Sequence, residues 1–133
     1  MGAKMPLFLS LLLAGCATVA SSGASAPSVL NKDAARLDGE TIHAVGWIVL
    51  EAEEVALWDG KRDREQGRDA GKCVSLLLPE ELAGSLKRFN RSQVTVTGRF
   101  HKDVASFDTT LFTGLCNVTA IEIESVDGVK AAR

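Results

Sequence analysis

Residues 73–100 read CVSLLLPEELAGSLKRFNRSQVTVTGRF, and the spacing of apolar residues changes twice within them. Residues 73–78 form a nearly continuous apolar run, which is typical of a buried strand. Residues 79–89 have the period of a short helix, with proline first, acidic residues in the opening turn and basic residues in the closing turn. Residues 93–100 return to strict alternation, which predicts a half-buried strand. The side chains predicted to face the core are Leu82, Leu86, Phe89, Val94, Val96 and Phe100.

Strand patterns also flank this segment on both sides. Residues 41–50 are β-branched and apolar on both faces, and the single internal glycine, Gly46, indicates a bend or bulge in a long strand. Residues 54–58 form a second strand after a tight connection, and residues 117–126 form a fifth strand with two inward isoleucines, Ile121 and Ile123. No internal repeat is present.

The predicted order is three strands, one helix and two strands. This order resembles the OB-fold, a mainly β, small five-stranded Greek-key barrel with a helix between its third and fourth strands. The resemblance covers residues 37–127 and leaves residues 128–133 as a C-terminal tail. It rests on element order, and an SH3-like or other small barrel with the same number of strands is the main alternative.

The N-terminus has the pattern of a secretory signal. Lys4 is followed by an apolar run over residues 6–13, which is far shorter than the roughly 20 residues of a membrane-spanning helix. Leu13-Ala14-Gly15-Cys16 resembles the lipobox of bacterial lipoproteins, in which the cysteine receives a diacylglycerol and becomes the first mature residue. The resemblance implies cleavage of residues 1–15 and anchoring in a bilayer through acylated Cys16. The alternative is an ordinary signal peptide with a chance cysteine.

The residues after the lipobox predict in which membrane the protein is anchored and how the domain is connected to that anchor. In the lipoprotein family an aspartate after the lipidated cysteine favours retention in the inner membrane. Ala17 stands there, so we expect the periplasmic face of the outer membrane. Residues 16–36 begin with small and polar residues, and we expect them to form a flexible linker.

Two further cysteines, Cys73 and Cys116, remain after lipidation. A disulfide is the default in an oxidising compartment, and the alternative is a reactive thiol, although no Cys-x-x-Cys motif is present. The OB-fold resemblance supports the disulfide. It places the starts of strands three and five at the same edge of the barrel, close to Cys73 and Cys116.

Aromatic side chains are the first candidates for binding. OB-folds often stack ligands on exposed aromatics of their second and third strands and neighbouring strands. Trp47 lies on the face opposite the inward residues of its strand, and Trp58 ends the second strand. Residues 101–116 form a connection that carries Phe107 and Phe112. Packing of these rings on the barrel is the alternative interpretation.

Residues 59–72 are the most polar part of the chain, with five basic and four acidic residues. Arg62 and Arg64 are candidates for an anion clamp. A Ca²⁺ loop is disfavoured because Arg64 stands where such a loop requires glycine. A solvated surface loop is the simpler interpretation.

His43 and His101 are the only histidines, and strand parity places both on outward faces. Strands one and four are neighbours in the predicted barrel, so the two rings could meet and form a metal site with Asp103. The simpler interpretation, which we adopt, is two surface histidines and no bound metal or cofactor.

These patterns favour some functions over others. A net charge of -2 and the envelope address disfavour nucleic acid. No spacing predicts a catalytic set, so we expect no enzyme activity. We expect a binding module for an envelope protein. A binder of small ligands, glycans or anions and a structural envelope protein without a discrete ligand are the alternatives.

Overall fold

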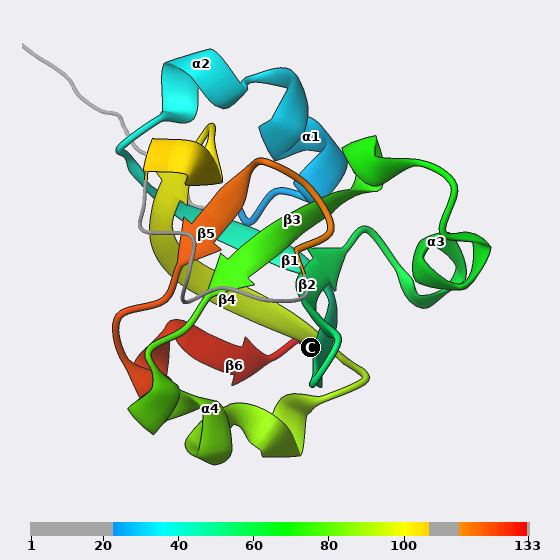
Figure 1. The fold of residues 1–133 in the computed structure, drawn as a ribbon, viewed down its shortest axis with the longest axis vertical. Coiled ribbons are helices and arrows are strands. Elements are labelled where there is room, and N and C mark those ends of the chain that lie inside the picture. Colours follow the sequence, from blue (N-terminus) through cyan, green and yellow to red (C-terminus); the bar gives the residue numbers. More distant parts are fainter. Residues whose placement is uncertain (1–22, 107–114, 133) are drawn as a thin grey trace, which may run out of the picture.

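The computed structural model describes residues 23–106 and 115–132, which fold around one closed β-barrel. Figure 1 shows α1 and α2 at one end of this barrel, α4 at the opposite end and α3 projecting from the side. The helices are α1 (Pro27–Lys32), α2 (Ala34–Leu37), α3 (Lys61–Gln66) and α4 (Glu80–Leu86), with 3-10 turns η1 (Ala70–Lys72), η2 (Lys87–Phe89), η3 (Val104–Ser106) and η5 (Val126–Gly128). The strands are β1 (Thr41–Glu51), β2 (Glu54–Trp58), β3 (Cys73–Leu77), β4 (Ser92–His101), β5 (Ala120–Glu122) and β6 (Val129–Ala131).

Five strands close the barrel in the order β1-β2-β3-β5-β4, with β4 pairing back onto β1. All neighbours are antiparallel except β3 and β5, which run parallel. This mainly β barrel, with α4 between β3 and β4, confirms the predicted OB-fold-like class. The sixth strand, β6, adds to the edge of β4.

Strand β1 is long and pairs with a neighbour on each side, β4 and β2. Its first part pairs with β4 and its last part pairs with β2. Gly46 pairs with β4 and directly precedes Trp47, the first residue that also pairs with β2, and a Cβ atom there would stand 2.3 Å from the main-chain oxygen of Trp58. Glycine is therefore required because the backbone of β2 approaches β1 closely at this point.

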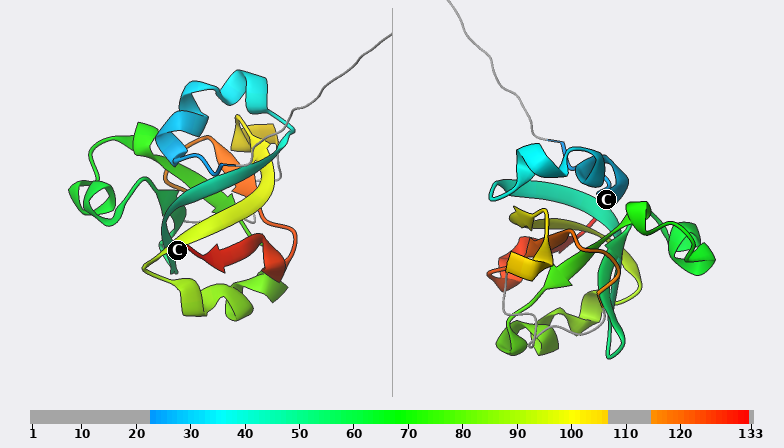
Figure 2. Two further views of the ribbon diagram at one scale, coloured as in Figure 1. Left: turned by 180° about the vertical axis from the view of Figure 1, so that it is seen from behind. Right: turned by 45° about the horizontal axis from the view of Figure 1, so that its top comes forward.

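The inward side chains of the strands form one continuous core. Val94, Val96, Phe100, Ile121 and Ile123 have no exposed surface, as their predicted inward parity requires. The predicted helix is also present, as α4 followed by η2, and its Leu86 is fully buried against this core. Figure 2 shows the two ends of the barrel from other sides, with α4 closing one and α1 and α2 the other.

The folded domain extends beyond both of the predicted limits. Residues 27–37 were expected to belong to a flexible linker, but they form α1 and α2, and Leu30 is only 3% exposed in the main core. Ser25 exchanges two main-chain hydrogen bonds of 3.0 Å with β1, through His43 and Val45. The linker prediction therefore fails over this part because apolar burial and strand pairing fix the segment.

The C-terminal part of the domain also differs from the prediction. The expected tail at 128–133 contains β6, whose Val129 is buried in the core. The fifth strand was expected over 117–126 but spans only Ala120–Glu122. Before it, the side chain of Asn117 bonds to η1 and that of Thr119 bonds to α1, so this stretch does not continue the strand ladder.

Candidate functional site

A second apolar cluster lies outside the barrel, on the outer face of β1, β2 and β3. Val49, Ala56, Trp58 and Cys73 are buried in it, and Trp47 and Cys116 pack against it while partly buried. Strand alternation explains the cluster, because Trp47 and Val49 project from β1 on the side opposite the main core. The register places Trp47 directly opposite Trp58.

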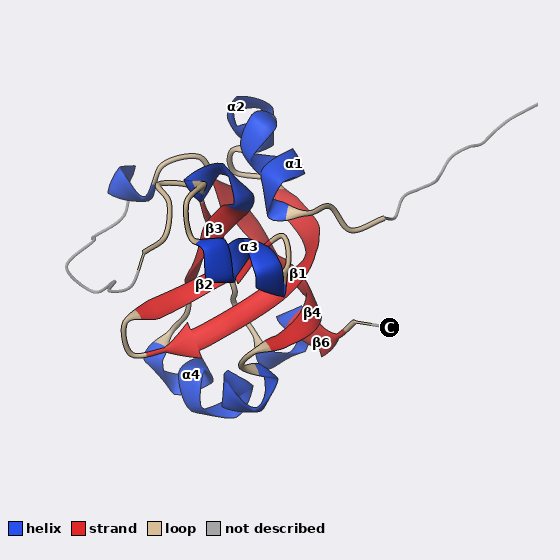
Figure 3. Ribbon diagram, turned by 90° about the vertical axis from the view of Figure 1, so that its right-hand side faces the viewer, coloured by secondary structure: helices blue, strands red, loops and turns tan. Residues whose placement is uncertain are grey.

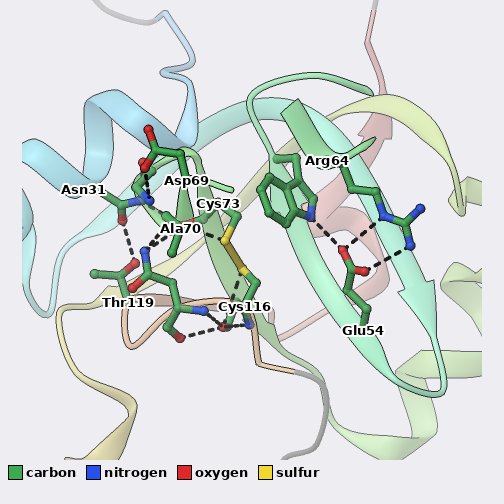
Figure 4. Close-up of a disulfide and its surroundings, with 12 residues drawn as sticks. Asn31, Glu54, Arg64, Asp69, Ala70, Cys73, Cys116 and Thr119 are labelled. Atoms are coloured by element: carbon green, nitrogen blue, oxygen red, sulfur yellow. Dashed lines mark hydrogen bonds and ion pairs between the residues drawn. A yellow bond between two sulfur atoms is a disulfide. The ribbon is translucent and has the colours of Figure 1, made fainter. Parts of the chain in front are cut away.

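Trp58 is 7% exposed and therefore packs instead of presenting its ring to a ligand. Its indole N–H donates a hydrogen bond of 2.7 Å to Glu54 Oε2. Arg64 Nη2 donates to the other oxygen of the same carboxylate at 3.1 Å, as Figure 4 shows. The polar edge of Trp58 is thus satisfied, and the expected ligand contact is replaced by a structural role.

Cys73 and Cys116 form a disulfide, as predicted, with a distance of 6.4 Å between their Cα atoms. Beside it, the fully buried hydroxyl of Ser75 accepts hydrogen bonds from the main-chain N–H groups of Cys116 at 3.0 Å and Asn117 at 3.2 Å. It also donates to Asn117 O at 2.8 Å. The disulfide, drawn in Figure 4, and the hydrogen bonds of this serine fix the end of the β4–β5 connection onto β3.

The same connection covers the rest of the outer face of β3. Leu77, Val104 and Ala120 form a third buried cluster, with Val104 contributed by η3. The main-chain N–H of Val104 donates to Val118 O at 2.7 Å. The outer face of β3, which many OB-folds use for ligands, is therefore closed in this protein.

The polar segment between β2 and β3 is not a simple loop, because it contains α3 and η1. Figure 3 shows α3 outside the barrel, over β1 and β2. None of the side chains of α3 is buried. Instead, Arg64 pairs with Glu54, and Lys72 Nζ pairs with Asp63 Oδ1 at 3.2 Å. This hydrogen bond with Asp63 is the main reason that the pKa of Lys72 is raised. Charge pairs thus hold α3 in place.

The acidic residues of this segment are mostly engaged within the fold. Asp59 Oδ1 accepts from Ser28 N at 2.8 Å, and Asp69 Oδ1 accepts from Gly71 N at 2.9 Å. By contrast, Lys61, Arg62 and Arg68 are exposed. Glu65 and Asp69 are exposed as well, so the segment presents charge of both signs to solvent, with three exposed cations beside two exposed carboxylates.

Trp47 lies beside these exposed charges. Its ring is half-buried, and Lys61 Nζ lies 5.9 Å from the ring centroid, within the range of a cation–π contact. Leu115, next to Cys116 of the disulfide, is 39% exposed. We call this surface the α3 face and define it by Trp47, Lys61, Arg62, Arg68 and Leu115. The other predicted aromatic candidates, Phe107 and Phe112, and the lipidation candidate, Cys16, lie outside the described residues.

The two histidines do not meet. His43 stands opposite Thr97 in the β1–β4 register, and its Nδ1 lies 2.9 Å from Thr97 Oγ1. His101 lies four residues further along β4, and its Nε2 lies 3.0 Å from Glu122 Oε1. Among residues 23–106 and 115–132, no group of three or more potential ligands is suited to a metal ion.

Sequence reasoning missed a groove with many polar groups along the middle of β4. Alternation in Val94-Thr-Val-Thr97 places two threonines outward, and β1, β6 and η5 supply the other side chains of the groove. The threonine alternation was visible in the sequence, but the side chains it faces come from distant segments.

Neither a membrane-spanning helix nor a similar known protein helps to assign a function to this site. In the part of the chain that the structure describes, no helix has the length and apolar character needed to cross a membrane. Comparison of the chain with protein-family models, curated proteins and solved structures found no match.

Proposed function

We propose that this chain is a lipid-anchored, non-catalytic binding module of the bacterial envelope, which holds a protein partner on its α3 face. The observation that carries the proposal is the composition of that face. It combines a half-buried indole, an exposed leucine and three exposed cations. Tryptophan and arginine are the residues that most often dominate binding energy at protein interfaces.

Charge defines the kind of partner. The chain has a net charge of -2, and the α3 face exposes three cations, Lys61, Arg62 and Arg68, beside the two exposed carboxylates of Glu65 and Asp69, while Asp63 pairs with Lys72. A partner with an acidic surface patch and an apolar residue opposite Trp47 would be complementary. The face carries no nucleophile paired with a base, which supports binding over catalysis.

Membrane anchoring is the second part of the proposal. It rests on the lipobox and on the position where the domain begins. Because Ser25 is bonded to β1, the chain between Cys16 and Ser25 spans at most about 30 Å. The domain would therefore stay close to the membrane, on the proposed periplasmic face of the outer membrane.

In-cell photocrosslinking tests the partner. A photoreactive residue at exposed Arg62 should give one discrete adduct with an envelope protein, and the same residue at exposed Glu81 on α4 should not. The double variant Arg62→Glu/Arg68→Glu should remove co-purification of that protein. Absence of an adduct from position 62, or equal adducts from both positions, would refute the α3 face.

Membrane fractionation tests the anchor separately. The native chain should appear in the outer-membrane fraction with acyl chains on Cys16. The variant Cys16→Ala should lose the acyl mass and leave that fraction. An unmodified Cys16 in the native chain would contradict the lipoprotein proposal without bearing on the α3 face.

A further inference from the structure

An open groove of about 500 Å³ lies between β4, β1, β6 and the η5 turn, away from the α3 face. Its volume is within the usual range for small-molecule sites. Its floor is formed by half-buried Thr95 and Thr97 of β4, and its walls are mostly exposed, with polar groups set among apolar surface that makes up the larger part of the lining. The lining residues are Thr41, Thr95, Thr97, Gly98, Glu124, Ser125, Asp127, Gly128 and Lys130.

Most polar side chains of this groove are not used within the fold. Over the described residues, the side chains of Thr41, Thr95 and Ser125 make no hydrogen bond, and no ion pair joins Lys130 to Glu124 or Asp127. The groove therefore offers three hydroxyls, two carboxylates and one ammonium group to a ligand. Together these groups can both donate and accept several hydrogen bonds.

The groove is preformed by close backbone packing. A Cβ atom on Gly128 of η5 would stand 2.7 Å from Thr97 O, so this turn lies directly against β4. A Cβ atom on Gly98 would stand 2.4 Å from Glu122 O, which fixes β5 against the same strand. The contact of 2.9 Å with His43 also orients the hydroxyl of Thr97. A rigid groove loses little entropy when a ligand binds.

The lining excludes several ligand classes by its chemistry. It contains no aromatic or long aliphatic side chain, so it lacks the apolar anchor of a protein hot spot. Two carboxylates and one lysine disfavour a polyanion such as nucleic acid. A neutral ligand rich in hydroxyl and amide groups matches the unused hydrogen-bond donors and acceptors of the groove. The hydroxyls of such a ligand donate to the carboxylates, and its carbonyls accept from Lys130.

We propose that this groove is a second binding site, which takes a neutral glycan chain carrying hydroxyl and acetamido groups. The site is separate from the α3 face. The proposal rests on the proposed function in one respect, which is that the cell envelope is where the protein would meet such a glycan. A chain that carries both sites would hold its protein partner next to envelope glycan.

Calorimetric titration of the mature lipidated chain in detergent tests the site. The probes are the N-acetylglucosamine tetrasaccharide, maltotetraose and a heparin tetrasaccharide. We expect the first to bind most tightly and the heparin fragment to show no binding. No heat with either neutral probe, or tightest binding of the heparin fragment, would overturn the proposal.

Matched variants locate the binding. Thr95→Val keeps a β-branched side chain in β4 but removes its hydroxyl, and Asp127→Asn keeps the size but removes the charge. Together they should weaken binding of the N-acetylglucosamine tetrasaccharide at least tenfold. Glu81→Gln on α4 should leave it unchanged. Unchanged affinity in the double variant, with a native circular dichroism spectrum, would refute the groove.

The crosslinking experiment distinguishes this inference from the proposed function. The adduct formed from position 62 should persist in the Thr95→Val/Asp127→Asn variant, because the α3 face is intact there. Loss of glycan binding with a retained adduct supports two separate sites. Loss of both in this folded variant would show that the groove is not independent of the α3 face and would overturn the proposal of a second site.

Discussion

The side-chain amide of Asn31 in α1 donates a hydrogen bond of 2.9 Å to the main-chain oxygen of Cys73, the first residue of β3. The same amide donates to Gly71 O at 2.8 Å, and Asn31 Oδ1 accepts a short hydrogen bond from Thr119 Oγ1. Asn117 donates to the oxygen of Cys73 as well, at 3.1 Å. One helical residue thus joins the N-terminal segment to the starts of β3 and β5, next to the disulfide.

Replacing Asn31 should therefore destabilise the whole domain. Asn31→Ala leaves the carbonyl of Gly71 and the hydroxyl of Thr119 without this partner, and we expect unfolding to require about 1–3 kcal/mol less. Alanine favours helix more than asparagine does, so a loss cannot be attributed to weaker α1. Urea unfolding measures the change, with exposed Lys32→Ala as control. Equal stability of the two variants would contradict the role of Asn31.

The disulfide should make a large contribution to stability. It links residues separated by 43 positions, and the chain-entropy model gives about 4 kcal/mol for a loop of this size. We expect Cys73→Ala/Cys116→Ala to unfold at a much lower urea concentration than the native chain. Reduction of the native chain should give the same shift. A loss below about 1 kcal/mol would show that Ser75 and the apolar cluster fix the β4–β5 connection alone.

The barrel was predictable because its signals are local. Val94, Val96 and Phe100 alternate, Leu82 and Leu86 follow the helical period, and each pattern has one matching secondary structure. The N-terminal helices carried a signal too, since Pro27 begins α1, and Leu30, Ala34 and Leu37 have helical spacing and all pack in or against the main core. The small residues before them resemble a linker, however, and the contacts that fix the segment come from distant parts of the chain.

The candidate site depended on information that the sequence does not contain. Trp47 and Trp58 are equivalent in sequence reasoning, but Glu54 and Arg64 hold Trp58 in a buried position while Trp47 remains half-exposed. The charge on the α3 face likewise depends on which carboxylates are engaged. Strand β6 was missed because three residues are too few to show alternation.

Two glycines should respond in opposite ways to alanine. Gly46→Ala would force a Cβ atom into the backbone of β2, so we expect a loss of at least about 2–3 kcal/mol. Gly84 lies inside α4 with nothing within 4 Å of a new Cβ atom, so Gly84→Ala should gain about 0.5–1 kcal/mol. Thermal unfolding compares them. A tolerated Gly46→Ala would refute the close approach of β1 and β2.

Acid should weaken the contact between the end of β1 and residues 90–91, directly before β4, through Glu51. Hydrogen bonds from Arg91, and then from Asn90, hold the pKa of this carboxyl below its usual value. Its stabilising effect is therefore complete above the unfolded pKa and is lost as pH falls through the folded one. Between about pH 5 and pH 3, Glu51→Gln should lose less unfolding free energy than the native chain. Identical pH slopes for the two chains would contradict the contribution of this pair.

Salt should loosen α3 without loosening the barrel. The helix buries no side chain, and Arg64 Nη2 holds it through Glu54 at 3.1 Å and, more distantly, through Glu51 at 3.9 Å. Such partly exposed ion pairs are screened as the Debye length shortens. Raising salt from about 0.05 M to about 1 M should speed hydrogen exchange of the α3 amides and leave those of β1 and β4 unchanged. Arg64→Gln should give fast exchange at both salt concentrations. If neither salt nor Arg64→Gln changed the exchange rate of the α3 amides, contacts other than these charge pairs would position the α3 face.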